Sequence, residues 1–279
     1  MQYDIEQITE WIYEYFNTAG KEKAVIGISG GIDSAVTAAL CARALGKDRV
    51  LGVIIPIESS LTDYTDAIKL IEEVGIQYIS TNQEQAFKQF YNDLINNPIV
   101  SHDFSNKTFH LHNPQLIRGN IKARLRMTSL YAISEIVNGL VVGTTNKSEA
   151  LIGYATKYGD GGVDIEPLMM YYKHEIFKMA EHLEVPQCII DKKPSAGLWE
   201  GQTDEDELGM SYELLDDILH YLEICLEDDF SREDNESGIE KDKLEKLRKV
   251  KKMIIANKHK LSVPPCPHRK IGKRRRNNG

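Results

Sequence analysis

The pattern of hydrophobic and polar positions changes its period repeatedly along the first half of the chain. Short apolar runs rich in β-branched residues are typical of buried strands, whereas apolar positions three or four residues apart are typical of amphipathic helices. Strands and helices that alternate in this way predict an α/β fold with a doubly wound parallel sheet flanked by helices. The predicted strands are residues 24–28, 49–57, 77–80 and 140–143, and the predicted helices are residues 4–18, 35–45, 61–75, 82–96 and 114–137.

The alternation ends in two segments of different composition. Residues 97–112 are rich in Asn, His and Ser and predict a loop, while residues 241–259 form a Lys-rich segment with helical spacing. No internal repeat or low-complexity linker divides the chain, so we expect one domain over residues 1–265. Residues 266–279 are strongly basic. Such a tail can bind nucleic acid by charge alone, but we expect it to be disordered and solubilising.

Composition and charge exclude several classes of protein. The formal net charge of −8 disfavours general nucleic-acid binding. The four cysteines are widely spaced without a C-x-x-C pair, which argues against a zinc ribbon, a redox pair or a disulfide framework. No window approaches the apolar length of a membrane span, and the acidic, amphipathic N-terminal segment is unlike a signal or transit peptide. We therefore expect a cytoplasmic protein without a membrane partner.

A glycine-rich turn joins the first predicted strand to the following helix. It reads Ser-Gly-Gly-Ile-Asp-Ser over residues 29–34, and it contains neither the Walker pattern nor a lysine. A strand, a glycine-rich turn and a helix N-terminus together aim backbone N–H groups at an anion, and Gly30 and Gly31 permit close approach of a phosphate. Asp33 suits such a cradle when a divalent cation lies between its carboxylate and the phosphates. A plain glycine turn is the alternative.

A second acidic residue follows the predicted strand at 140–143. Ligands of open parallel sheets lie beyond the carboxyl ends of the strands, so Asp33 and Glu149 are expected to converge if their strands are close and parallel. Two carboxylates that converge on ATP form a magnesium site. The alternative for Glu149 is a capping-box glutamate early in a helix.

The SGGIDS turn resembles the pyrophosphate-binding loop of the N-type ATP pyrophosphatases. Three further blocks narrow the resemblance to ammonia-dependent NAD synthetases: GNIKARLRM at 119–127, GTTNKSEALIGYATKYGDGGVDIEPL at 143–168, and PSAGLWEGQTDEDELGMSYELLD at 194–216. Together the four blocks span most of the chain. The resemblance implies a Rossmann-like fold of the adenine nucleotide alpha hydrolase type. Glutamine-using relatives carry a preceding glutaminase or nitrilase domain, for which no room is expected here, so ammonia is the implied nitrogen source.

The resemblance implies a ligase that converts deamido-NAD, ATP and ammonia into NAD, AMP and pyrophosphate, the last step of NAD biosynthesis. A nicotinate carboxylate is a poor electrophile, and transfer of AMP to it creates a mixed anhydride with a good leaving group. Ammonia then displaces AMP. The site must hold the departing pyrophosphate, neutralise charge and keep water from the adenylate.

The resemblance also assigns residues on the ATP side. Asp33 and Glu149 match the magnesium ligands, and Lys173 matches a contact that neutralises phosphate charge. Asp33 and Lys173 are thereby expected to be catalytic. The implied ATP-binding residues are Gly27, Ile28, Ser29, Gly30, Gly31, Ile32, Asp33, Ser34, Thr144, Lys173 and Ser195.

The deamido-NAD side is assigned in the same way. Asp160, within a glycine-rich turn, is the candidate base that takes a proton from ammonium, with an ordinary turn aspartate as the alternative. The His-Lys pair at 259–260 matches a C-terminal element of the family, although Leu261 stands where the family usually has Arg. In the family this end of the chain and the dinucleotide lie at a homodimer interface. The implied deamido-NAD-binding residues are Arg124, Lys157, Asp164, His259 and Lys260.

The helix at 114–137 carries other charged residues. Asn120 and Arg124 are four residues apart and share a face that can look into the cleft. Arg118, Lys122 and Arg126 have the same spacing on another face, where solvated surface charge or contact between subunits is expected for at least some of them.

Four rival functions stay open. Another synthetase of the superfamily, such as one for GMP, shares the loop, whereas a tRNA-thiolating enzyme is expected to show the cysteine pairs that this sequence lacks. A non-catalytic adenine-nucleotide sensor does not need Asp33, Glu149 and Lys173 together. An RNA-binding protein is suggested by the tail alone and opposed by the net acidity.

Overall fold

The computed structural model describes residues 1–98, 100, 114–197, 199, 201–226 and 241–262. The predicted basic tail and most of the predicted loop at 97–112 lie outside the described residues. Within them, the sheet has four parallel strands in the order β3-β2-β1-β4, which confirms the predicted parallel α/β fold. The strands are β1 (Lys23–Gly27), β2 (Val50–Ile54), β3 (Gln77–Ser80) and β4 (Gly139–Val141).

The helices of the first half follow the predicted pattern closely. They are α1 (Gln2–Ala19), α2 (Ile32–Leu45), α3 (Leu61–Val74), α4 (Glu84–Ile95) and α6 (Pro114–Ile136), with the 3₁₀ turn η1 (Lys47–Arg49) before β2. Gly75 ends α3 in the left-handed conformation, as its position after the last apolar residue predicts. The second half adds α7 (Lys147–Ile152), α8 (Lys173–His182), α9 (Gln187–Ile190), α10 (Asp204–Leu208), α11 (Tyr212–Leu226), α12 (Lys241–Asn257) and η2 (Lys258–Lys260).

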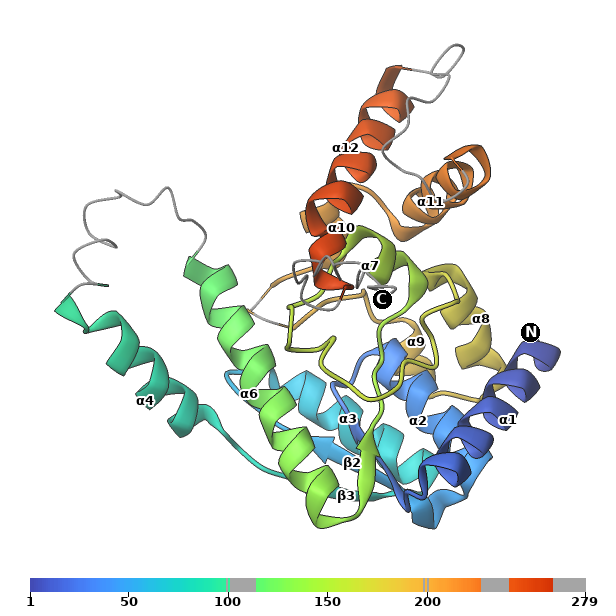
Figure 1. Ribbon diagram of the computed structural model, residues 1–279, viewed down its shortest axis with the longest axis vertical. Coiled ribbons are helices and arrows are strands. Elements are labelled where there is room, and N and C mark those ends of the chain that lie inside the picture. Colours follow the sequence, from blue (N-terminus) through green and yellow to red (C-terminus); the bar gives the residue numbers. More distant parts are fainter. Residues whose placement is uncertain (99, 101–113, 198, 200, 227–240, 263–279) are drawn as a thin grey trace, which may run out of the picture.

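Alternate residues of β1 face different layers of the molecule. Ala24 and Ile26 pack in a core with α1, α2, α3 and α8, while Val25 packs in a second core with α4 and α6. A side-chain period of two therefore buries both faces of this central strand, as a doubly wound sheet requires. A third core joins α7, α11 and α12 and lies apart from the sheet (Figure 1).

The topology brings several loops to the carboxyl edge of the sheet. The parallel register pairs Val25 of β1 with Leu51 of β2 and Val141 of β4, so the segments that follow these strands leave the sheet side by side. The long helix α6 lies across the same region and packs against β1 and β4. No helix in the described part of the chain is long and apolar enough to cross a membrane.

Candidate active site

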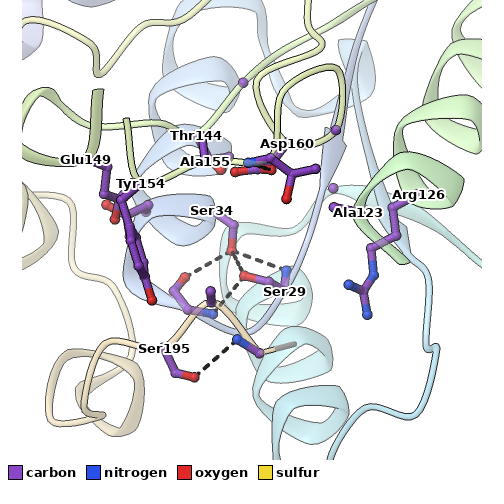
Figure 2. Close-up of a pocket in the computed structure, with 18 of the residues that line it drawn as sticks. Ser29, Ser34, Ala123, Arg126, Thr144, Glu149, Tyr154, Ala155, Asp160 and Ser195 are labelled. Atoms are coloured by element: carbon purple, nitrogen blue, oxygen red, sulfur yellow. Dashed lines mark hydrogen bonds between the residues drawn. The ribbon is translucent and has the colours of Figure 1, made fainter. Parts of the chain in front are cut away.

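A cavity of about 690 Å³ opens at this carboxyl edge. Its walls come from the segments after β1, β2 and β4, from α6, from the loop after α7, from residues 192–197 and from the end of α12 with η2. Figure 2 shows Ser29 and Ser34 between Glu149 and Tyr154 on one side and Arg126 on the other. Elements far apart in the sequence therefore build a single chamber large enough for a nucleotide.

The phosphate loop, residues 29–34, is held by its own hydrogen bonds. Ser34 Oγ donates to the carbonyl oxygen of Gly31 at 2.9 Å and lies 3.2 Å from Ser29 Oγ, which in turn accepts from the Gly31 backbone N–H at 3.2 Å (Figure 2). Gly31 is the N-cap of α2, and no side chain caps this helix. The first-turn N–H groups of α2 stay available for an anion, which is the arrangement of a phosphate site.

Gly30 allows the phosphate loop to pack against α3. Its φ of 78° is in the left-handed region, and a Cβ atom there would overlap the backbone carbonyl oxygen of Asp63. Gly30 itself is absent from the cavity wall, while the other predicted ATP-binding residues, from Gly27 to Ser195, all line it. Gly30 therefore shapes the loop rather than the cavity surface.

Asp33 and Glu149 converge, as the topology predicts, and Lys173 lies between them. Lys173 Nζ is 2.6 Å from Asp33 Oδ2 and 3.2 Å from Glu149 Oε1. The lysine side chain is only 2% exposed, whereas the two carboxylates are 18% and 15% exposed, on the cavity side. One cation thus lies between two carboxylates at the base of the cavity, next to the phosphate loop.

The electrostatics of this group follow from its burial. Burial raises the pKa of Glu149 to about 7, the charge of Lys173 opposes this rise, and the charge of Asp33 adds to it. Burial also lowers the pKa of Lys173, but the attraction of Asp33 and Glu149 outweighs it and moves the pKa upward overall. Lys173 is therefore a permanent cation, while the charge of Glu149 beside it changes near neutral pH.

Asn146 links the two carboxylates and was missed by the sequence interpretation. As N-cap of α7, its Oδ1 accepts from the Glu149 backbone N–H at 3.0 Å, while its Nδ2 donates to Asp33 Oδ1 at 3.0 Å. The capping alternative for Glu149 is thus half right: the helix is capped, but the Glu149 side chain faces Lys173. An Asn three residues before a Glu at a helix start is the sequence signal that could have identified this cap.

Tyr212 and Asp204 extend the group and were also missed. The Tyr212 hydroxyl donates to Asp204 Oδ2 at 3.1 Å and lies 3.4 Å from Glu149 Oε1. Asp204 Oδ1 accepts from the Ala196 backbone N–H at 2.9 Å, so this carboxylate connects the segment at 194–197 to the acidic group. Both residues stand inside the third matched block, but nothing in its local pattern marks them as a pair.

Thr144 is positioned by a buried carboxyl group on the neighbouring segment. Glu166 Oε2 accepts from the Thr145 backbone N–H at 3.1 Å, and Oε1 accepts from Thr145 Oγ1 at 2.9 Å. A Cβ atom at Gly143 would overlap this carboxyl group, so glycine allows the carboxyl group to take this position. Burial raises the pKa of Glu166 to about 8. A neutral carboxyl group thus fixes the loop that carries Thr144 into the cavity.

The predicted deamido-NAD side forms the opposite part of the cavity. Arg124 Nε donates to the Lys157 carbonyl oxygen at 3.2 Å, and Asn120 Oδ1 accepts from Thr156 Oγ1 at 2.8 Å. Both α6 residues line the cavity, so their predicted common face is confirmed. Asp160 faces the cavity and accepts from the Thr156 backbone N–H at 2.8 Å, and burial among the surrounding walls raises its pKa.

The predicted pair His259 and Lys260 is joined to the deamido-NAD side of the cavity by hydrogen bonds to backbone carbonyl oxygens. Lys157 Nζ donates to the His259 carbonyl oxygen at 2.6 Å, and Lys260 Nζ donates to the Gly153 carbonyl oxygen at 2.8 Å. Asn257 Nδ2 donates to the Ile152 carbonyl oxygen at 2.9 Å, which anchors the end of α12 beside α7. His259 and Lys260 both line the cavity.

Asp164 is placed differently from the other predicted residues. Its Oδ1 accepts from the Tyr131 hydroxyl at 3.1 Å, and its Oδ2 accepts from the Val141 backbone N–H at 2.7 Å. It is not among the residues that line the cavity. Both carboxylate oxygens instead join the segment at 164 to the end of β4 and to α6.

The basic residues on the other face of α6 are less uniform than the sequence suggested. Lys122 is buried and pairs with Glu58 at 2.9 Å, and Arg118 pairs with the same carboxylate and lies 4.6 Å from the centre of the Tyr91 ring. Arg126 instead lines the cavity. Lys122 is thus a buried ion-pair partner and Arg126 a cavity residue, whereas Arg118 is 32% exposed, so the expectation of solvated charge for some of the three holds for Arg118 alone.

Lys192 is a further cation beside the phosphate loop that the sequence interpretation missed. Its Nζ lies 2.6 Å from Asp63 Oδ1 and 2.9 Å from Asp66 Oδ2, and 3.3 Å from the Gly30 carbonyl oxygen. It therefore ties the first turns of α3 to the phosphate loop, across 129 residues of sequence from Asp63.

A parallel sheet, a glycine-rich loop that is held by its own hydrogen bonds, a helix N-terminus and an acidic pair meet at one cavity, which is an arrangement typical of α/β nucleotide enzymes. The model of the NAD synthase family matches residues 4–264. Among curated proteins, the NH3-dependent NAD+ synthetase of Methanosarcina acetivorans is 45% identical over 264 residues, 94% of this chain and 96% of that one. The enzyme of the same name from Pyrococcus furiosus is 41% identical over 95% of both chains. The chain belongs to the NAD synthase family, which confirms the resemblance seen in its sequence.

Solved structures agree with this assignment. NMN synthetase from Francisella tularensis superposes with a TM-score of 0.76 at 32% identity, covering 95% of this chain and 98% of that chain. The NH3-dependent NAD synthetase from Campylobacter jejuni, in complex with nitrate, has a TM-score of 0.72 at 28% identity and covers 96% and 99% of the two chains.

Proposed function

We propose that this protein is an ammonia-dependent NAD synthetase, which uses ATP to amidate deamido-NAD and releases AMP and pyrophosphate. The observation that carries the proposal is the arrangement of Asp33, Lys173 and Glu149 beside the phosphate loop, in a cavity that continues to Arg124 and Lys157. One end of that cavity suits phosphates and the other a second substrate. Family membership and relatives named for this reaction support the same conclusion.

The phosphate side performs the first half of the reaction. N–H groups of the phosphate loop and of the start of α2 hold the β- and γ-phosphates, and Lys173 neutralises charge as pyrophosphate leaves. The nicotinate carboxylate attacks the α-phosphorus, so that an acyl-adenylate forms and the bond to pyrophosphate breaks. Thr144 and Ser195 supply hydroxyl groups at the cavity wall for further contacts with the nucleotide.

Magnesium fits the donor set at this end of the cavity. Among the described residues, no group of three or more His, Cys, Asp and Glu side chains is arranged to hold a metal. Asp33 and Glu149 supply two carboxylates, and Mg²⁺ in nucleotide sites is held by one or two carboxylates while phosphates and water complete its shell. These two residues would hold the ion. When bound, it would neutralise phosphate charge and improve pyrophosphate as a leaving group.

The second half of the reaction needs neutral ammonia on the deamido-NAD side. Ammonium is not nucleophilic, so a proton must be accepted before attack on the acyl-adenylate. Asp160 faces the cavity, and desolvation there raises its pKa above the ordinary aspartate value, which makes it a better proton acceptor than a free aspartate. Ammonia then adds to the acyl carbon and AMP departs with the electrons of the bond that joined it to the acyl group. Arg124, Lys157, His259 and Lys260 border this region.

The proposal is tested by an assay for NAD formed from deamido-NAD, ATP, magnesium and ammonium. We expect NAD, AMP and pyrophosphate in equal amounts from the wild type and a loss of about 10²- to 10³-fold in the Asp33→Ala variant. Asp242→Ala serves as the matched control, because this aspartate is 82% exposed on α12 and does not line the cavity. ATP binding without NAD formation under any nitrogen source would contradict the proposal and favour a nucleotide sensor.

A second candidate acceptor is suggested by the Francisella tularensis neighbour, which is named as an NMN synthetase. Its acceptor would be nicotinate mononucleotide, which lacks the adenylate half of deamido-NAD. Both acceptors present the same nicotinate carboxylate, so the chemistry at Asp33 and Lys173 is unchanged. Comparison of kcat/KM for the two acceptors decides between them, and we expect deamido-NAD to be preferred because the most similar curated relatives described above are NAD+ synthetases.

A homodimer in the cytoplasm completes the proposal. Large apolar side chains are exposed on β3, on α4 and at the start of α6, where Leu116 also borders the cavity. Burial of such a surface against a second copy is expected to stabilise a dimer. Light scattering after size-exclusion chromatography gives the mass in solution, and a monomer at all concentrations would oppose this part of the proposal. The exposed apolar residues are Tyr78, Ile79, Phe90, Leu94 and Leu116.

A further inference from the structure

Three cations on the cavity wall differ in what they face. Lys173 and Lys192 each pair with two carboxylates. Arg126 also lines the cavity, yet it forms no ion pair with a carboxylate in the described part of the chain. Its Nε donates to the Ile55 carbonyl oxygen at 3.2 Å and its Nη2 donates to Ser59 Oγ at 3.2 Å, and both acceptors are neutral.

A guanidinium group in such surroundings is only partly compensated. Two of its five N–H donors are used by Ile55 and Ser59, and the others make no hydrogen bond to the described residues. Burial lowers the pKa of Arg126, although nearby Asp160 and Asp63 oppose this, and arginine stays protonated in proteins. A partly buried cation without a direct carboxylate contact is stabilised by an anion bound in the cavity.

Arg118, on the same helix, has its charge compensated by groups of the protein itself. It pairs with Glu58, and its guanidinium lies over the rings of Phe87 and Tyr91, at 4.9 and 4.6 Å. Arg118 does not line the cavity. The helix α6 therefore carries one arginine whose charge is paired within the protein and another, beside the cavity, whose remaining donors make no hydrogen bond to the described residues.

The neighbours of Arg126 place it between the two halves of the cavity. Its charge interacts with Asp63, which lies beside Gly30 and the phosphate loop, and with Asp160 on the deamido-NAD side. Figure 2 shows Arg126 across the cavity from Glu149, with Ser29 between them. An anion bound to Arg126 would thus lie between the phosphate loop and the deamido-NAD side, across the cavity from Glu149.

We infer that Arg126 is a substrate-binding residue that donates hydrogen bonds to an oxyanion, a phosphate or carboxylate oxygen, at this junction. Two anions meet there under the proposed function, on which this inference rests: the phosphates of ATP and the nicotinate carboxylate or phosphates of deamido-NAD. A guanidinium fork can contact two oxygens of either group. Arg126 complements Lys173, which serves the opposite side of the phosphates.

Separate titrations of ATP and deamido-NAD into the wild type, Arg126→Met, Arg126→Lys and Arg118→Met test this inference. Loss of a charge-assisted hydrogen bond predicts binding of the contacted substrate that is about 10- to 100-fold weaker in Arg126→Met. Weaker ATP binding identifies the nucleotide phosphates as the source, and weaker deamido-NAD binding identifies the acceptor. Arg126→Lys keeps the charge and is expected to recover part of the affinity.

Arg118→Met and thermal unfolding separate binding from folding. We expect Arg118→Met to bind both substrates as the wild type does, although it also loses a cation from α6. Millimolar guanidinium is expected to restore binding in Arg126→Ala, whereas urea is not. Affinities within twofold of the wild type for both substrates in a folded Arg126→Met protein, with unchanged kcat, would overturn the inference. The titrations measure binding and need no turnover. A wild type that binds ATP but forms no NAD would therefore contradict the proposed function and leave the inference about Arg126 to be decided by the titrations.

Discussion

Two lysines on either side of the phosphate loop are each held between two carboxylates, but their surroundings differ. The side chain of Lys173 is 2% exposed, whereas that of Lys192 is 26% exposed. Water can replace a lost partner of Lys192, but little water reaches Lys173. The same pairing therefore has different consequences. Around Lys173, removal of one charged group leaves the others buried without a partner, whereas around Lys192 the pairing mainly joins α3 to the phosphate loop. The pairs are Lys173 with Asp33 and Glu149, and Lys192 with Asp63 and Asp66.

Two glycines of the site also let another segment approach. At Gly30, whose carbonyl oxygen Lys192 contacts, the carbonyl oxygen of Asp63 occupies the space of a Cβ atom, and at Gly143 the carboxyl group of Glu166 does so. In the first case the obstacle is backbone, and in the second it is the end of a side chain. The two contacts therefore differ in how much they can adjust.

The largest effect is expected when the buried lysine is removed. In Lys173→Met the carboxylates of Asp33 and Glu149 lose their common cation, and phosphate charge loses its neutralising partner. We expect kcat to fall by about 10²- to 10³-fold and the free energy of unfolding to fall by about 3–5 kcal/mol. NAD formation and chemical denaturation measure the two effects. A variant that keeps near wild-type kcat would show that Lys173 is only structural.

A smaller loss is expected from Gly143→Ala, which forces the new methyl group against Glu166. Displacement of this carboxyl group breaks its bonds to Thr145 and shifts Thr144, so we expect a loss of about 1–3 kcal/mol in stability together with weaker ATP binding. The double variant Gly143→Ala with Glu166→Ala removes the obstacle and is expected to regain part of the stability. Purely additive losses in this double-mutant cycle would disprove the steric explanation.

Lys192→Met is expected to have a modest effect, in contrast to Lys173→Met. Since the pair is partly exposed, we expect at most about 1 kcal/mol of lost stability and a change in the KM for ATP of less than about fivefold. Titration with salt sharpens the comparison, because screening should reduce the effect of Lys192→Met more than that of Lys173→Met. Equal losses of stability in Lys173→Met and Lys192→Met would show that the difference in exposure between the two lysines has no energetic consequence.

A further effect concerns Glu166 and is defined by its dependence on pH. Its pKa of about 8 in the folded protein lies above the value of 4.5 for a free glutamate, so between these values the folded state binds more protons than the unfolded state. The stability of the wild type relative to Glu166→Gln should therefore fall as pH rises from about 5 to about 8. Thermal unfolding of both proteins across this range gives the difference. A difference that does not change with pH would mean that Glu166 is ionised throughout.

The fold was largely predictable because its elements have strong local signals. Gly75 marked the end of α3, and the apolar runs of β1 and β2 marked strands buried on both faces. Convergence of Asp33 and Glu149 also followed from topology alone, since both come after neighbouring parallel strands.

The remainder of the site depends on contacts that no local pattern encodes. Lys192 meets Asp63 across 129 residues, and Tyr212 reaches Glu149 across 63. Arg118 and Arg126 belong to one series of positions four residues apart on α6. Only the packing of α6 in the fold decides that Arg126 lines the cavity while Arg118 does not. On the deamido-NAD side, carbonyl oxygens of the backbone accept several of the bonds, and side-chain identities do not reveal them.

The anchoring of Asn257 and Lys260 beside α7 has a consequence for how the protein is made. The phosphate loop precedes α12 in the chain, so this half of the fold can form while synthesis continues. The cavity wall at α12 and η2 must wait, because Asn257 and Lys260 follow the residues that they fasten, Ile152 and Gly153, by 105 and 107 residues. A polypeptide released before α12 would keep the phosphate loop but lack this wall. Assembly of the two parts of the cavity is thus separated in time.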